Sequence, residues 1–390
     1  MTTEPPLLSV PEHGVPPVVD TSEAFAEVRA GLAAGSGPIA IDAERASGIR
    51  YGQRAFLVQL RRAGARTVLL DSEELGDLSA LNAALSGGEW VIHSVTQDLP
   101  CLQDRGMVPT ALFDTELAAR LLGWEKFGLA AVAERTLGIR LAKEHSAVDW
   151  STRPLPEEWL NYAALDVEVL LPIRDALAAE LVAAGKWEFA EQEFAHLLDF
   201  RPKVHAEPWR RTNGLAKLTS RAELAKVREL WLTRDAMASE VDIAPSKVLR
   251  DRELIDMARS RARSSDDLLG RWSRLSRADA ARLFRALRRA ARLTPDELPP
   301  KREPSRLPRS PFSHTEIKER TAALKAAVAE VAEEHTIPHD VLLQPALVKS
   351  LAASGREDVE AFLTEHGARP WQVALTAPPL SAALDELPRA

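Results

Sequence analysis

The chain has 390 residues, of which 45% are hydrophobic and 27% charged, proportions close to the averages of globular proteins. These values exclude a wholly disordered or fibrous chain, and the length favours two or three domains because a single core stops growing at about 250–300 residues. The single cysteine, Cys101, excludes an intrachain disulfide framework and a zinc ribbon, and it fits a reducing compartment.

The N-terminal stretch MTTEPPLLSV lacks the basic region and the apolar core of a secretory signal. Nowhere do about 18 apolar residues follow one another, as a membrane-spanning helix requires. We therefore expect a cytoplasmic protein with no membrane partner, and we take a monomer as its state.

The net charge of −7 is distributed unevenly along the chain. Residues 201–300 hold 23 Lys and Arg against 14 Asp and Glu, a net +9, so the remainder carries −16. A basic middle third is compatible with a nucleic-acid partner even though the whole chain is acidic.

The first 200 residues alternate strand-like and helix-like patterns, which is typical of an α/β domain. Helices are predicted at 22–35, 78–87, 112–123 and 128–138, the last two ending in glycine. Strands are predicted at 37–44, 55–62, 66–71 and 89–94, and turn residues between the first three indicate adjacent antiparallel strands. Together they favour a mixed sheet of about five strands with flanking helices.

Residues 154–173 form the strongest predicted helix of this domain. Pro156 suits its first turn, and Trp159, Tyr162, Leu165 and Val169 recur at steps of three and four residues. This spacing predicts a buried apolar stripe along one face of the helix.

From about Thr212 onward the pattern is that of amphipathic helices with arginine-rich polar faces. Residues 294–312 contain six prolines and read as an extended linker between two helical modules. The stretches 243–258 and 337–352 share Ile, Pro, Val-Leu and Leu at nearly the same spacing, with one inserted residue. This similarity suggests one helical unit used twice, although unrelated helical hairpins also share such a pattern.

Four acids stand out because each lies at the edge of an apolar element. Asp42 and Glu44 alternate along a strand and so point to the same side, where two like charges repel. Asp98 lies near the start of the helix after strand 89–94, a position that helix-capping alone also explains. Asp166 follows Tyr162 by one helical turn, beside the apolar stripe, where an unpaired acid is costly.

These acids come from three separate segments and have no histidine or cysteine set beside them. Oxygen ligands of this kind favour Mg²⁺ or Mn²⁺ over zinc. Two such ions about 4 Å apart offset the carboxylate charges and promote attack of water on a phosphodiester. We therefore interpret the four acids as ligands of two divalent ions.

The spacing of three motifs resembles ribonuclease D, of the tyrosine-bearing subgroup of the DEDD exonuclease superfamily. The motifs are IDAE (41–44), HSVTQDL (93–99) and YAALD (162–166), and FLVQL (56–60) and FDTELAARLLG (113–123) support them. The resemblance covers residues 1–205 and implies an α/β, ribonuclease H-like (DnaQ-type) exonuclease domain with a mixed sheet. It implies cutting from the 3′ end with release of nucleoside 5′-monophosphates.

The resemblance also implies roles for particular residues. Asp42, Glu44, Asp98 and Asp166 match the metal-binding acids, and Tyr162 matches the residue that orients or deprotonates the attacking water. Because a tyrosine with a pKa near 10 is a poor base at neutral pH, we expect Tyr162 to position the water.

Several neighbours of these motifs are further candidates. Ala43 stands where related enzymes often have Thr, which leaves a backbone contact to substrate. His93 and Gln97 are expected substrate contacts, although a histidine at a strand end also serves as a structural hydrogen-bonder. Gln59 points either to the site or to the backbone. Asp149 and Trp150 are expected to lock a loop, and His145 is left out because it does not lie four residues before Asp166.

Residues 212–295 resemble the HRDC domain, a helical module found in helicases and ribonuclease D, most clearly over 221–258. Residues 271–293 contain eight arginines, and we expect Arg271, Arg274 and Arg285 to contact nucleic acid. The alternative is a solvated helix face. Trp231 and Trp272 could stack bases but are more often core residues. Residues 313–390 resemble a second, divergent HRDC-like domain that packs rather than binds.

The sequence thus predicts a metal-dependent 3′-5′ exoribonuclease that trims RNA 3′ ends, above all those of tRNA precursors, with two Mg²⁺ or Mn²⁺ ions. One alternative is a DNA exonuclease of the same superfamily, because the distinction depends on contacts to one 2′-hydroxyl. Another is a non-catalytic RNA-binding scaffold, which would be expected to have lost at least one of the metal acids.

Overall fold

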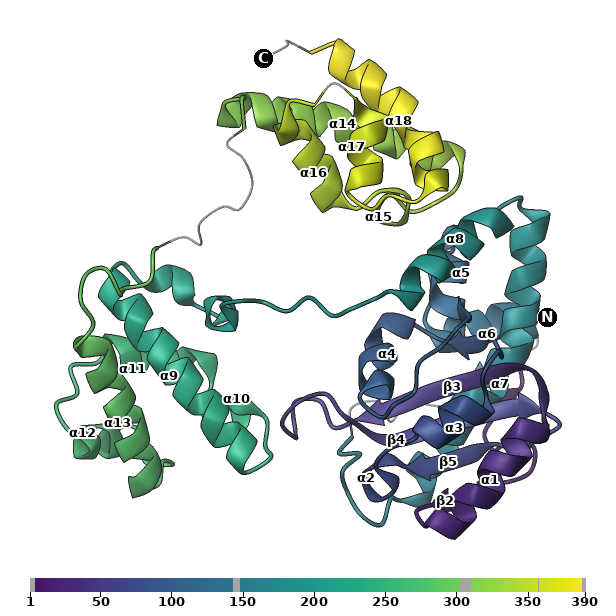
Figure 1. The fold of residues 1–390 in the computed structure, drawn as a ribbon, viewed down its shortest axis with the longest axis horizontal. Helices are drawn as coiled ribbons and strands as arrows, with labels where there is room; N and C mark the ends of the chain where they lie inside the picture. The colour runs from purple at the N-terminus through teal and green to yellow at the C-terminus, as the bar shows by residue number, and fades with distance from the viewer. Residues whose placement is uncertain (1–3, 143–147, 302–309, 357, 388–390) are drawn as a thin grey trace. The chain divides into compact units, whose positions relative to one another are not determined.

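A six-stranded mixed sheet organises the N-terminal domain (Figure 1). The computed structural model describes residues 4–142, 148–301, 310–356 and 358–387. The strands, in sheet order, are β2 (Val18–Val19), β5 (Val68–Asp71), β4 (Ala55–Ala63), β3 (Ser36–Arg45), β6 (Trp90–Ile92) and β7 (Leu112–Asp114). β4 and β5 are antiparallel, whereas β3, β6 and β7 run parallel to one another. β1 (Leu7–Leu8) pairs with β8 (Arg140–Leu141) in a separate two-stranded sheet.

Eight helices of this domain connect and cover the strands. They are α1 (Ser22–Ala34), α2 (Ser72–Leu75), α3 (Ser79–Ala84), α4 (Val95–Gln103), α5 (Thr115–Leu121), α6 (Leu129–Leu137), α7 (Glu157–Ala183) and α8 (Trp187–Leu198). The long helix α7 packs against β4, β5 and β6, and α5 and α6 pack against α7. This places α7 directly beside the strand that neighbours β3.

The structure confirms the mixed α/β architecture and corrects three details. The sheet has six strands, not about five. The underestimate arose because β2 and β7 are only two and three residues long. Residues 112–114, predicted as the start of a helix, form β7, and the helix begins at Thr115. The predicted helix 154–173 continues to Ala183, since Pro172 does not end it.

The rest of the described chain is helical apart from turns. It comprises α9 (Arg221–Glu240), α10 (Pro245–Val248), α11 (Asp251–Arg259), α12 (Ser265–Arg271) and α13 (Arg277–Ala291), then α14 (His314–Glu334), α15 (His339–Leu342), α16 (Pro345–Ser354), α17 (Val359–Glu365) and α18 (Pro370–Asp385). Two short 3-10 turns, Pro208–Arg211 and Leu215–Lys217, precede α9. Of the predicted linker, residues 302–309 lie outside the described residues, and the remainder holds no helix or strand. Within the described ranges, none of the helices combines the length and apolar composition that crossing a bilayer requires.

The two groups of five helices repeat the same local geometry. α10 and α15 are both four residues long and start 94 residues apart. Each is preceded by a non-glycine residue with positive φ, Asp242 at 50° and Thr336 at 51°. Leu249 and Leu343, which follow these helices, have φ values of −156° and −155°. The backbones match at a constant offset of 94 residues, whereas the shared Ile, Pro, Val-Leu and Leu align only with one inserted residue.

The chain divides into two compact units, and the C-terminal helices belong to the first one. This unit comprises residues 1–44, 54–202 and 309–390, and the second comprises 45–53 and 203–308. In the first unit, the buried carboxylate of Glu193 on α8 accepts hydrogen bonds from Arg369 Nε at 2.7 Å and Trp371 Nε1 at 2.8 Å. Phe189 stacks on Trp371 with ring centroids 4.7 Å apart.

A second contact joins the C-terminal helices to the exonuclease fold through backbone carbonyls. Lys186 Nζ donates to Leu121 O at 2.8 Å and to Thr336 O at 3.1 Å, and burial lowers the pKa of this lysine. Gly123 permits the approach, because a Cβ there would lie 2.5 Å from Thr336 O and its φ is +77°. The last module therefore packs, as expected from its sequence.

In the second unit, residues 45–53 pack against the first helices of the arginine-rich module. Ala244 N donates to Ile49 O at 2.9 Å, and Tyr51 Oη donates to Asp235 Oδ2 at 3.0 Å. The core of this module includes buried Trp272, and half-buried Trp231 packs against it. Both tryptophans therefore serve the core.

We predict that Glu193→Ala destabilises the first unit by about 3 kcal/mol, because it leaves a largely buried arginine without its acceptor. Urea unfolding followed by tryptophan fluorescence measures the loss. Glu365→Ala is the matched control, since it breaks an exposed ion pair with Arg356 and should cost less than about 1 kcal/mol. Equal losses in the two variants would contradict this role for Glu193.

Candidate metal centre and active site

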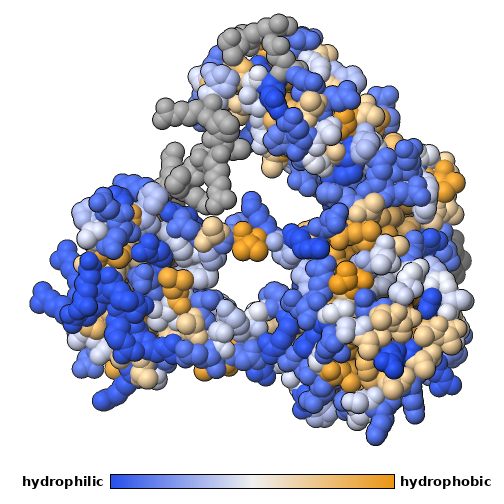
Figure 2. Space-filling model, viewed as in Figure 1, coloured by the Kyte–Doolittle hydropathy of each residue, from blue (hydrophilic) through white to orange (hydrophobic). Residues whose placement is uncertain are grey.

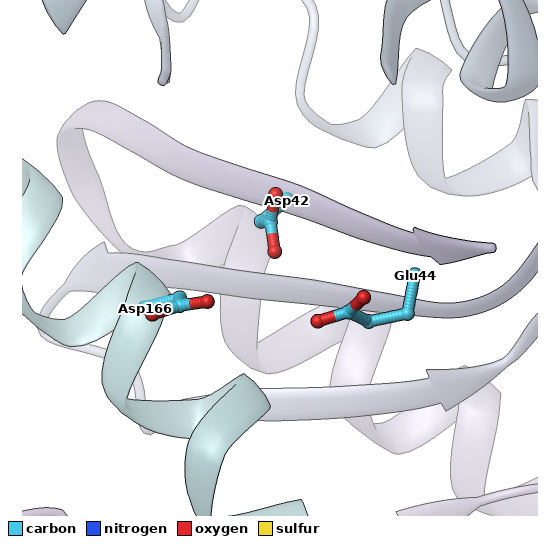
Figure 3. Close-up of side chains that lie close together, drawn as sticks. All are labelled: Asp42, Glu44 and Asp166. Carbon is cyan, nitrogen blue, oxygen red and sulfur yellow. The ribbon is translucent and has the colours of Figure 1, made fainter. Parts of the chain in front are cut away.

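Three carboxylates converge at the point where β3 meets α7. Ligand atoms of Asp42, Glu44 and Asp166 all lie within 4.8 Å of one another. Figure 3 shows the first two projecting from the strand and the third from the helix, with their oxygens directed toward a common space. Glu44 and Asp166 are each only 8% exposed. Two of the three acids are therefore largely withdrawn from water and close enough to repel one another.

Local structure explains this convergence. Residues 42 and 44 share one side of β3 because side chains alternate along a strand. Their strand lies in the interior of the sheet, with buried Ile41 and Ala43 on either side of Asp42. Asp166 lies ten residues into α7, whose neighbouring residues Leu165 and Val167 are buried. The acids are held by core elements rather than by loops.

Gln59 on β4 adds a neutral donor to the cluster. Its side chain is fully buried, and its Nε2 donates to Asp42 Oδ2 at 3.1 Å. The amide thus points to the site, one of the two orientations considered from sequence. It orients the Asp42 carboxylate without cancelling its charge.

The fourth predicted acid, Asp98, lies in the first turn of α4 and is 5% exposed. It is outside the group of carboxylates that approach within 4.8 Å. Its neighbour Cys101 donates its thiol to the Asp98 carbonyl oxygen at 3.0 Å. The structure therefore brings together three of the four predicted ligands, and the role of Asp98 stays a prediction.

Tyr162 lies one turn before Asp166 on α7, and it keeps its proton. Burial raises the pKa of its hydroxyl, and the negative charges of Asp166, Glu44 and Asp42 raise it further. Its ring packs near Trp150, with centroids 6.4 Å apart, and Trp150 contacts Trp159 edge-on at 5.7 Å. In the predicted apolar stripe, Leu165 and Val169 are buried, whereas Trp159 and Tyr162 are half-buried. The neutral phenol is suited to hydrogen bonding rather than to acting as a base.

The predicted substrate contacts near these acids differ in their surroundings. Ala43 is buried in β3, and Gln97 is exposed on α4 with its Nε2 bonded to Ser94 Oγ at 2.8 Å. His93 is half-buried, and its Nδ1 lies 2.9 Å from Thr115 Oγ1. Burial lowers the pKa of His93 to about 4. A neutral histidine held by a neighbouring hydroxyl fits the structural alternative.

An arginine that the sequence interpretation missed secures the loop carrying Trp150. Arg153 donates to both carboxylate oxygens of buried Asp71, at 2.5 and 2.9 Å. It also donates to the carbonyl oxygens of Trp150 at 2.8 Å and Phe56 at 3.0 Å. Asp149, in turn, accepts from Ser151 N at 3.2 Å. The 149–155 loop is thereby locked, as expected for Asp149 and Trp150, while His145 lies outside the described residues.

The donor set of the cluster fits a divalent metal ion. It consists of carboxylate oxygens alone. Among the described residues, these three acids are the group of acids, histidines or cysteines whose ligand atoms lie close enough together to hold a metal ion. Hard ions with oxygen coordination, such as Mg²⁺, Mn²⁺ or Ca²⁺, suit these ligands. Asp42, Glu44 and Asp166 could hold such an ion, which would offset their mutual repulsion.

The arginines proposed for nucleic-acid contact lie on α12, α13 and the turn between them. Arg271 places its guanidinium 5.0 Å from the centroid of the Trp272 ring, and Arg274 pairs with Glu253. Arg285 is exposed and lines a shallow groove of about 290 Å³ with Arg282 and Arg289. All three predicted arginines are exposed, and Arg274 already has an acidic partner. In the view of Figure 2, the surface of this module is mostly hydrophilic.

Comparison with family models assigns three segments of the chain. Residues 16–182 match a 3′-5′ exonuclease model, residues 223–271 match the HRDC domain, and residues 311–384 match a 3′ to 5′ exonuclease C-terminal domain. The first segment contains all four predicted acids and Tyr162.

Relatives and solved structures extend this match over most of the chain. Ribonuclease D of Escherichia coli is 31% identical over 314 residues, 78% of this chain and 81% of that protein. Its crystal structure, titled an exoribonuclease involved in structured RNA processing, superposes with a TM-score of 0.72 at 27% identity, covering 96% of this chain and 99% of that one. A protein from Bifidobacterium adolescentis reaches a TM-score of 0.87 at 38% identity, covering 98% of this chain and 100% of that one. The alignment with ribonuclease D of Acidiphilium cryptum, 31% identical, spans 64% of each protein.

The depressed pKa of His93 predicts that its imidazole stays neutral from pH 7.5 to pH 5.5. An unfolded histidine has a pKa near 6.5, so the unfolded chain binds this proton more readily, and the stability that neutral His93 contributes is lost as pH falls from about 6.5 towards 4. NMR titration of the imidazole signal, identified by its absence from His93→Gln, measures the midpoint. A midpoint near 6.5 would show that burial does not control this residue.

Proposed function

This chain belongs to the ribonuclease D family, and we propose that it trims the 3′ ends of structured RNA precursors, tRNA precursors above all, releasing nucleoside 5′-monophosphates. Its family and its exonuclease domain make it a 3′-5′ exoribonuclease. The observation that carries the proposal in this chain is the convergence of Asp42, Glu44 and Asp166 beside the hydroxyl of Tyr162.

The acidic cluster and the exonuclease fold imply a divalent metal ion. We propose that the site takes two ions, Mg²⁺ or Mn²⁺, held by Asp42, Glu44, Asp98 and Asp166. When bound, such a pair lowers the pKa of the attacking water and offsets charge on the phosphate. Gln59 keeps the Asp42 carboxylate in place through its hydrogen bond of 3.1 Å.

The proposed role of Tyr162 is to hold the attacking water. Its hydroxyl is protonated, since burial and three neighbouring carboxylates raise its pKa, so it can donate one hydrogen bond and accept another. The ring of Trp150 lies next to the tyrosine ring, with the centroids 6.4 Å apart. Together these contacts fix the line of attack on the scissile phosphate, which lowers the entropic part of the barrier.

Substrate contacts around the acids are also proposals. Ala43 lies on β3 beside Glu44, Gln97 lies on α4 beside Asp98, and His93 lies between β6 and α4. A neutral His93 would contact RNA by hydrogen bonding rather than by ion pairing with a phosphate.

We propose that the HRDC domain binds RNA electrostatically through Arg271, Arg274 and Arg285. The groove beside Arg285 is also lined by Arg282 and Arg289, which pair with Glu240 and Glu229, and its arginines are suited to phosphate oxygens. The repeated backbone geometry supports the interpretation of residues 313–390 as a second, divergent HRDC-like domain that packs on the exonuclease fold. We also propose a monomer located in the cytoplasm, the latter because a single cysteine fits a reducing compartment.

We predict that Asp42→Asn lowers kcat on a 3′-tailed tRNA precursor with Mg²⁺ by about 10²- to 10³-fold, the scale of removing one electrostatic stabiliser from an active site. Labelled RNA and gel analysis of the released mononucleotides measure the rate. Asp358→Asn is the control, because Asp358 caps α17 through Ala361 N at 2.8 Å and has no place in the cluster.

Equal product from Asp42→Asn and the wild type would contradict the metal site. A DNA oligomer of the same sequence, tested in the same assay, decides between the ribonuclease and the DNA exonuclease. Wild-type protein that binds the RNA without releasing mononucleotides would indicate a non-catalytic scaffold.

We predict that Arg285→Ala raises KM for the same RNA while kcat is unchanged, because a cation that is not part of the acidic cluster contributes only to binding. The slope of log Kd against log salt concentration should fall by about 1, the effect of losing one phosphate contact. Arg356→Ala, between α16 and α17, should leave the slope unchanged. An unaltered slope in Arg285→Ala would indicate that this face of the HRDC domain is only solvated.

A further inference from the structure

The buried side chain of Asp114 holds the first turns of two helices at once. One carboxylate oxygen, Oδ1, accepts from Ser94 N at 3.1 Å, and also from Glu116 N at 2.9 Å and Leu117 N at 3.1 Å. The other oxygen, Oδ2, accepts from Val95 N at 2.9 Å. The first and last of these donors lie at the start of α4, and the other two at the start of α5.

The position of this acid is costly unless these hydrogen bonds are made. Asp114 is 4% exposed, and burial raises its pKa to about 6, while the backbone hydrogen bonds act in the opposite direction. At neutral pH the group is ionised, and a negative charge is favourable at a helix N-terminus. A single carboxylate thus satisfies N–H groups that two helices would otherwise leave without partners.

The turn that Asp114 holds is strained. Ser94 has φ 62° and ψ 53°, a left-handed conformation, and its side chain does not cap α4. A residue other than glycine in this sparsely populated region is unfavourable and persists only when its surroundings enforce it. The carboxylate of Asp114 supplies that enforcement from the neighbouring strand β7.

Thr115 secures the other side of the same turn. It is fully buried, and its Oγ1 lies 2.9 Å from Nδ1 of His93, the residue directly before Ser94. The adjacent pair Asp114 and Thr115 therefore fixes residues 93–95, where β6 ends and α4 begins.

We propose that Asp114 and Thr115 are positioning residues that set the direction of the first turn of α4 and thereby the place of the Asp98 carboxylate in the active site. Asp98 lies three residues after Val95, in that same turn. The proposal rests on the proposed role of Asp98 as a metal ligand. It gives the stretch FDT (113–115) a function that none of the three acidic motifs describes.

The test is Mn²⁺ binding by electron paramagnetic resonance, without substrate, to the full-length wild type and to Asp98→Asn, Asp114→Asn and the double variant. An asparagine at 114 turns one acceptor oxygen into an N–H donor that faces another donor. We expect one of two bound Mn²⁺ ions to bind about 10- to 100-fold more weakly in Asp114→Asn, the usual effect of losing a residue that orients a ligand. The double variant should lose no more than Asp98→Asn alone, because both changes act through one carboxylate.

Asp358→Asn serves as the matched control, since it also weakens a helix cap but should leave both Mn²⁺ affinities unchanged. If Asp98→Asn weakens one ion while Asp114→Asn changes neither, the positioning proposal is overturned and the metal site stands. If Asp98→Asn changes neither affinity, the assignment of Asp98 fails and the positioning proposal fails with it.

Thr115 provides the test if Asp114→Asn does not fold. Thr115→Val keeps the shape of the side chain and removes the hydroxyl next to His93, whereas Thr115→Ser keeps the hydroxyl. Weaker binding of one Mn²⁺ in the valine variant, faster amide exchange at the start of α4, and recovery of both in the serine variant would support the proposal. Wild-type Mn²⁺ affinity and exchange in both variants would overturn it.

Discussion

The repulsion between three carboxylates confined at the junction of β3 and α7 is the constraint on which the site depends. Their ligand atoms lie within 4.8 Å of one another, and two of the acids are almost entirely buried. Such an arrangement is unfavourable unless positive charge offsets it. A central strand and a long helix packed on the sheet can enforce this proximity because their own stability comes from the hydrophobic core.

Residues other than the acids hold the side chains of the site in place. Gln59 orients one carboxylate, and Trp150 restricts the tyrosine ring. Arg153 holds the loop of that tryptophan to the sheet through Asp71. Burial raises the pKa of Tyr162 most, and the charges that raise it further come from the same acids that would bind the metal.

Local periodicity was enough to predict the main parts of the site. Alternation along a strand placed Asp42 and Glu44 together, and one helical turn placed Tyr162 beside Asp166. The short strands β2 and β7 were missed because two or three residues show no periodicity and form only by pairing with neighbours. Arg153 and Asp114 were missed for a related reason, since their partners include a carboxylate and backbone groups that lie up to 97 residues away in the chain.

The contact of Lys186 with two carbonyl oxygens bears on how the C-terminal module can evolve. A hydrogen bond to a main-chain oxygen depends on the position of the backbone and not on the side chain of that residue. Docking through Leu121 O and Thr336 O therefore requires the positive φ at 336 and the glycine at 123, but it places no requirement on the side chains of Leu121 and Thr336, unlike the contact of Glu193 with Arg369 and Trp371. If the two helical modules arose by duplication, the residue at 336 could change its side chain without loss of this hydrogen bond to Lys186.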